Sequence, residues 1–204
     1  MRSHVLCVCA AAALIVASTP TAHADEPAPL PRVGVGVALP LSTGVAGTVY
    51  VPVHLHPRVR VEPGLGYAAT TQDTKGKTIT LKDSSSLVSL GLGVFYVLRP
   101  SDDAVIYVGP RAAVLLRSTV NEYTDFTTTS ERTDFLLTLA VGGEHFLGKH
   151  FSLGIEAAIG RTWQGQPKVT DTPPSPYADP STVSAEVSQS TTSTVGSLFG
   201  RFYF

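Results

Sequence analysis

Charged residues occur at alternate positions in several segments that otherwise alternate apolar and small side chains. The charges that lie opposite the apolar residues of those segments are Arg60, Glu62, Arg111, Glu144, Glu156 and Arg201, with Arg117 farther along the same face. Residues i and i+2 of a strand share a face, so these side chains point away from the apolar one. Three of the first six are positive and three are negative. Because an unpaired buried charge is very costly, we expect a neutral, salt-bridged cluster. An ion path lined by the same groups is the alternative.

Three histidines and one serine are the other candidates for chemistry. His54 and His56 are spaced i and i+2, which suits metal chelation, but no third ligand stands at a fixed spacing from them. Acyl transfer would need a histidine and a serine on one strand face. His145 and Ser152, the available pair, fall on opposite faces across the short turn at 148–150. We therefore expect no metal site, no cofactor and no catalytic residues.

The first 24 residues have the pattern of a secretory signal. A positive N-terminal region precedes an apolar stretch from Val5 to Ala17, and an A-x-A cleavage site follows at 22–24. The apolar stretch is shorter than the roughly 20 residues that a spanning helix needs, although an uncleaved anchor is the alternative. Both cysteines, Cys7 and Cys9, lie in this segment, so we expect no disulfide in the mature chain.

The mature chain, 25–204, has the length of one domain and an unusually low charge content. Charged residues are 15% of the sequence, against about 25% in soluble domains. Without Arg2, fourteen Lys and Arg oppose sixteen Asp and Glu, so there is no basic face for nucleic acid. No run after the signal approaches the ~18 continuous apolar residues of a membrane helix.

Period-two alternation predicts eight strands after a Pro-rich lead at 25–32. The expected strands lie at about 33–39, 49–55, 58–70, 88–98, 106–117, 137–147, 151–163 and 196–204. Short connections follow the second, fourth and sixth strands. Longer polar connections lie at 71–86, 121–131 and 165–189. We expect the first to be a loop, with a hairpin extension of the flanking strands as the alternative, and the last, which is proline-rich, to lack regular structure.

The final strand has an apolar outward face that ends on Phe202 and Phe204. A soluble domain, including a lipocalin-like barrel, seldom ends on exposed aromatic residues, whereas a membrane barrel carries them at its interface. This ending, and the turn stretch from Phe146 to Glu156, resemble those of small bacterial outer-membrane β-barrels of the OmpA/OmpX-like eight-stranded superfamily.

The resemblance implies an all-β, eight-stranded, antiparallel up-and-down transmembrane barrel in the outer membrane of a Gram-negative bacterium. It also implies that the barrel-assembly machinery recognises Phe204 and Phe202. We expect Tyr67, Tyr96 and Trp163 to anchor the barrel at the membrane interfaces.

From these features we expect a monomer of structural or surface-interaction type with a closed interior, surrounded by outer-membrane lipid. The connections at 71–86, 121–131 and 165–189 would meet any extracellular ligand, and nucleic acid is not an expected partner. The alternatives are a small ion or solute channel and a lipid-modifying outer-membrane enzyme.

Overall fold

Every regular element in the computed structural model is a β-strand. The structure describes residues 33–41, 47–75, 80–123, 127–172, 181–184 and 189–204, so the expected signal and lead, 1–32, lie outside the described residues. The strands are β1 (Gly34–Pro40), β2 (Gly47–Tyr50), β3 (Val53–His56), β4 (Val59–Lys75), β5 (Thr80–Ser101), β6 (Ala104–Glu122), β7 (Thr127–Phe146), β8 (Phe151–Gln164), β9 (Lys168–Thr172), β10 (Ser181–Ser184) and β11 (Gln189–Tyr203). Within the described part of the chain, no helix is long and apolar enough to cross a membrane.

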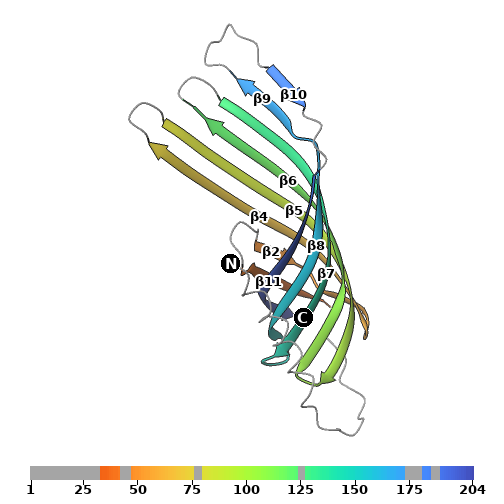
Figure 1. Ribbon diagram of the computed structural model, residues 1–204. Helices are drawn as coiled ribbons and strands as arrows, with labels where there is room; N and C mark the ends of the chain where they lie inside the picture. The colour runs from red at the N-terminus through yellow and green to blue at the C-terminus, as the bar shows by residue number, and fades with distance from the viewer. Residues whose placement is uncertain (1–32, 42–46, 76–79, 124–126, 173–180, 185–188) are drawn as a thin grey trace, which may run out of the picture.

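The strands close into an eight-stranded antiparallel barrel, as the sequence predicts. Neighbours in sequence pair from β4 to β8, β8 pairs with β11, and β11 returns to β1 (Figure 1). β2 and β3 together form one barrel strand beside β4, interrupted at Val51 and Pro52. Pro52 has no N–H to donate, whereas the Val51 N–H still donates to the Pro63 carbonyl at 2.9 Å.

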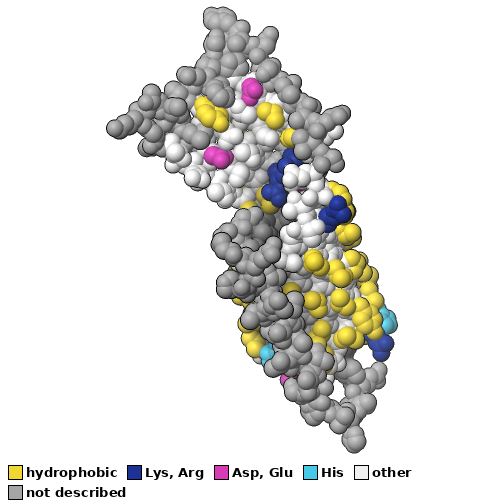
Figure 2. Space-filling view, in the orientation of Figure 1, with side chains coloured by type: hydrophobic (Ala, Val, Ile, Leu, Met, Phe, Trp, Pro, Cys, Tyr) yellow, Lys and Arg dark blue, Asp and Glu magenta, His cyan; other side chains and the backbone are white. Residues whose placement is uncertain are grey.

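The two faces of the barrel wall differ as the alternation predicts. Leucine, valine, isoleucine and aromatic side chains are exposed on the outer face, and Figure 2 shows them gathered over the lower part of the molecule. Tyr67, Tyr96 and Trp163 are all among them. Trp163 lies at the outer end of β8 and Tyr67 lies midway along β4, while Tyr96 pairs with Val59 beside the short turn between β3 and β4.

Several strands extend well beyond the apolar band, so much of what was expected to be connecting loop is strand. β5 has 22 residues, against about 9–11 for a membrane-spanning strand. β4 and β5 continue through most of 71–86, β6 and β7 occupy both ends of 121–131, and β9 and β10 lie within 165–189. These segments were expected to be loops because they lack the apolar alternation of a lipid-facing strand, although for 71–86 the alternative of a hairpin extension is confirmed. Their serines and threonines still pair in regular register, and they form a sheet that projects from one end of the barrel (Figure 1).

Aromatic rings inside the barrel lie over glycines of neighbouring strands. A Cβ placed on Gly36 would lie 2.5 Å from the Tyr50 ring, and one on Gly142 would lie 2.3 Å from the Tyr107 ring. A Cβ on Gly154 would lie 2.2 Å from the Phe199 ring. These glycines let large rings fill a narrow interior. Tyr50, Tyr107 and Phe199 belong to the main buried cluster.

Candidate functional site

Five strands bring the six predicted interior charges together. Arg60 and Glu62 come from β4, and the others come one each from β6, β7, β8 and β11: Arg111, Glu144, Glu156 and Arg201. We call these six residues the inner charge cluster. All point inward, because each has the parity of the buried positions on its strand.

Arg201 lies at the centre of the inner charge cluster. Its guanidinium donates to Glu62 at 2.7 Å and also to Glu144. Arg60 contacts the same two carboxylates, with its Nε 2.8 Å from Glu62 and its Nη1 2.9 Å from Glu144. The side chains of Arg60, Glu62 and Glu144 have no exposed surface. Two arginines and two glutamates therefore form a closed square of ion pairs.

Hydroxyl groups and rings complete the contacts of this square. Glu144 accepts hydrogen bonds from Ser152 at 2.5 Å and from Tyr203 at 2.6 Å. The Arg201 Nε donates to the Tyr50 hydroxyl at 3.0 Å, and its guanidinium carbon lies 4.1 Å from the centre of the Phe199 ring. The ions are thus bound by charge, hydrogen bond and cation–π contact together.

Arg111 links the square to Glu156 on its outer side. It donates to Glu62 at 3.1 Å and to Glu156 at 2.6 Å, and Tyr107 donates to Glu156 at 2.9 Å. The Arg111 side chain is 30% exposed, unlike the buried square below it. All six charges are thus paired and they sum to zero. A neutral network of paired charges can persist where a lone ion could not.

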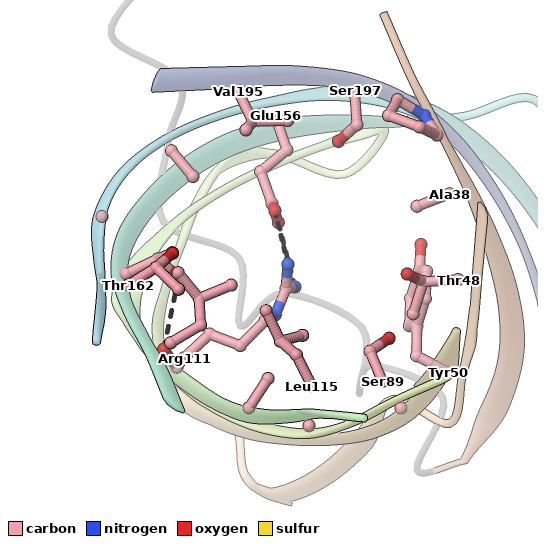
Figure 3. Close-up of a pocket in the computed structure, with 18 of the residues that line it drawn as sticks. Ala38, Thr48, Tyr50, Ser89, Arg111, Leu115, Glu156, Thr162, Val195 and Ser197 are labelled. Carbon is pink, nitrogen blue, oxygen red and sulfur yellow. Dashed lines mark hydrogen bonds and ion pairs between the residues drawn. The ribbon is translucent and has the colours of Figure 1, made fainter. Parts of the chain in front are cut away.

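A cavity of about 260 Å³ lies on the outer side of Arg111 (Figure 3). Its wall includes leucines at 87, 115 and 136, and several inward positions carry no side chain or only a methyl group. These small residues are Ala38, Gly64, Gly91, Ala113, Ala158 and Gly160. Figure 3 shows Arg111 and Glu156 joined across the space between the strands. The glycine and alanine at alternate positions were the available sequence signal for this hollow.

A second cluster of charges near the outer end was missed from the sequence. Asp134 has no exposed side-chain surface and lies 2.9 Å from Arg117 and 2.8 Å from Arg132. It also accepts from the Gly165 N–H at 3.1 Å. We call Arg117, Arg132 and Asp134 the outer charge cluster. The i, i+2 spacing of Arg132 and Asp134 was the available signal, but both fall where the apolar alternation fades.

The other candidate residues lie in separate places. His54 lies near Tyr203, with 6.1 Å between ring centres, and the exposed His56 accepts from the Arg58 N–H at 3.2 Å. No group of three possible metal ligands occurs among the described residues. His145 is exposed on the outer face, whereas Ser152 is buried. Phe202 and Phe204 are exposed at the end of β11, with ring centres 5.4 Å apart.

Known proteins share the fold. A model of the outer membrane protein β-barrel domain matches residues 9–188. The crystal structure of a major outer membrane protein from Thermus thermophilus is similar with a TM-score of 0.61, at 17% identity, over 84% of this chain and 98% of that one. CarO of Acinetobacter baumannii gives a TM-score of 0.42 at 12% identity, over 86% and 98% of the two chains. Ail of Yersinia pestis gives 0.39 at 9%, over 84% and 93%. No curated protein matches the sequence.

Proposed function

This chain belongs to the outer membrane protein β-barrel domain family and lies in the outer membrane, and we propose that it serves there as a closed barrel presenting a projecting sheet to partners outside the cell. Two features support this proposal: the bonded interior and the length of the outer strands. In this reading the protein is a monomer without enzymatic activity.

The inner charge cluster is the observation that carries the closed-barrel part of the proposal. An eight-stranded barrel is only wide enough for side chains to fill it. Here the filling side chains are Arg60, Glu62, Glu144 and Arg201, together with Phe95, Tyr107 and Tyr203, and all are buried. To open a path for ions, several paired charges would have to separate at the same time, which is costly in a dry interior.

The projecting sheet supports the surface-interaction part. On β4, residues 64–67 pair with β2 on one side, but 68–75 pair with β5 alone among the described residues. Within the described part of the chain this strand edge is free, and a partner in an extended conformation can add a strand to such an edge. The exposed residues 70–73 of β4 are Thr-Thr-Gln-Asp, so the edge is polar.

Conductance recording tests the closed interior. The chain is refolded into planar lipid bilayers, and we expect no steady conductance above that of bilayers without protein. As a positive control, Arg201→Ala removes the central side chain and should raise the conductance. Steady single-channel steps from the unchanged protein would instead identify a channel.

A shortened hairpin tests the interaction surface. Replacing residues 70–85 by Asn-Gly joins the paired Ala69 and Ser86 through a two-residue turn. The matched control replaces only 76–79 and joins the paired Lys75 and Thr80, which keeps the β4 edge. Cells displaying each form are assayed on a panel of immobilised proteins and polysaccharides. We expect the first variant to lose the binding that the control retains. Equal binding by both would rule out the β4 edge.

A further inference from the structure

The outer half of the barrel is hollow, although its inner half is packed. The inner charge cluster and the aromatic rings fill the cross-section below Arg111, yet above it about 260 Å³ remains open. The register explains the change. Gly64 pairs with Gly91, and Gly91 pairs with Ala113, so three adjacent strands present almost no side chain at one level. The cavity is therefore bounded by the wall and closed at its inner end.

The wall of the cavity suits an apolar body with a few hydrogen-bonding groups. Leu87 and Leu115 form a small buried cluster against Ala68, Ala113 and Leu136. The lining also carries hydroxyl groups, those of Thr48, Ser89, Thr138, Thr162 and Ser197 among them. Such a mixture, mainly apolar with dispersed polar groups, is typical of small-molecule sites.

The charge at the mouth of the cavity is unbalanced. Arg117 and Arg132 are directly paired across β6 and β7, a position in which like charges repel. They share one carboxylate, Asp134, so the residues that the structure describes at this level carry an excess positive charge. The Arg117 side chain lines the cavity and is 41% exposed. On β5, Leu87 pairs with Arg117. The next inward-facing acid on that strand, Asp83, lies four positions farther out.

We infer that the outer half of the barrel is a blind binding site for a small amphipathic organic anion. The apolar or aromatic body lies between Leu87, Leu115 and Leu136, and the carboxylate pairs with Arg117 at the mouth. Arg111 lies six positions inward from Arg117 on β6, about 20 Å along the strand, and its charge is already balanced by Glu62 and Glu156. The anion therefore binds at the mouth. This inference is independent of the projecting sheet and would stand if that sheet had no partner.

The test uses three probes of one skeleton that differ in charge. The chain is refolded in nanodiscs of zwitterionic lipid, and ¹⁹F NMR titrations follow 4-fluorophenylacetate, 4-fluorophenethylamine and 4-fluorophenethyl alcohol. Empty nanodiscs measure partition into lipid. We expect saturable binding of the carboxylate, about tenfold tighter than that of the amine, because charge-assisted pairing with arginine is strong.

Neighbouring alanines on β6 provide a matched pair of variants. Ala113→Leu places a branched side chain in the cavity, whereas Ala112→Leu places the same side chain on the outer face. We expect the first to abolish binding of the carboxylate and the second to leave it unchanged. Arg117→Gln should reduce binding of the carboxylate to that of the alcohol, while Asp134 keeps its contacts with Arg132 and Gly165. Migration of unboiled and boiled samples on a denaturing gel verifies that each variant is folded.

Three results would overturn the inference. The first is the absence of saturable binding beyond that of empty nanodiscs. The second is binding of the amine as tight as that of the carboxylate, which would exclude an anion site at Arg117. The third is undiminished binding by folded Ala113→Leu, which would place the probe outside the cavity.

Discussion

Removing one ion from the centre of the barrel should cost far more than removing it together with its partner. Arg201→Met leaves three interior carboxylates against two arginines, and Glu144→Gln leaves three arginines against two carboxylates. Both side chains are essentially without exposed surface. Breaking a buried pair from one side costs about 3–5 kcal/mol, which is the loss of unfolding free energy expected for each single variant.

The double variant restores neutrality, with Arg60 and Arg111 against Glu62 and Glu156. Its loss should therefore fall short of the sum of the two single losses by about 2–3 kcal/mol, near the upper end of measured couplings. Lys82 and Glu122 give the matched control, because they form a half-exposed pair at 3.6 Å on the projecting sheet. An exposed pair of this kind should show a coupling below about 0.5–1 kcal/mol.

Urea unfolding in lipid vesicles measures all the variants on one scale, provided that the slopes with denaturant agree. Two results would refute the reasoning. One is single variants within a few tenths of a kcal/mol of the unchanged protein, and the other is a central coupling no larger than that of the Lys82–Glu122 control. Either would mean that water solvates these ions, and the case for a closed interior would fail with it.

Two other predictions concern the barrel wall and its last residue. Gly154→Ala places a methyl group 2.2 Å from the Phe199 ring and 2.3 Å from the Gly143 carbonyl oxygen, so we expect a loss of about 1–3 kcal/mol in urea unfolding from overpacking. Gly143→Ala, which meets nothing within 4 Å, should change little, and equal losses would contradict the argument. Deleting Phe204 should lower the amount of folded protein in the outer membrane more than it lowers the unfolding free energy, because its exposed ring contributes little packing. Equal membrane levels for the shortened and full chains would contradict this.

Much of the barrel could be predicted from sequence because lipid and interior impose opposite demands on alternate residues. The alternation through Val88–Leu98, for example, predicts both a strand and the side of it that faces lipid. The same parity places Arg60, Arg111 and Arg201 inside. The sequence limits the possible ion-pair partners of each interior charge but does not identify them, because the strand register depends on pairing across the whole ring. In the structure Arg111 pairs with Glu156 and Glu62. Glu144 pairs instead with Arg60 and Arg201.

The outer half was harder to predict for two physical reasons. Beyond the membrane both faces of a strand meet polar surroundings, so the alternation fades and strands such as β9 have the composition of loops. A cavity is also a property of several strands at one level. Gly64, Gly91 and Ala113 are ordinary residues in their own segments, and only their register makes them a gap. The ion pairs of Asp134 could not be predicted for the same reason, because its two arginines are recognisable as partners only once the register of β6 and β7 is known.

The position of Arg201 on the last strand links closure of the barrel to neutralisation of its interior. β11 completes the ring by pairing with both β1 and β8, and it carries Arg201, one of the two arginines shared by Glu62 and Glu144. Until β11 is in place, the other five interior charges sum to −1, and Glu62 and Glu144 share Arg60 alone. Closing the ring of backbone hydrogen bonds and neutralising the interior are therefore one event. A chain that stops short of Arg201 is left with both an open edge and an unbalanced core, so an unfinished barrel is distinguished from a finished one by charge as well as by shape.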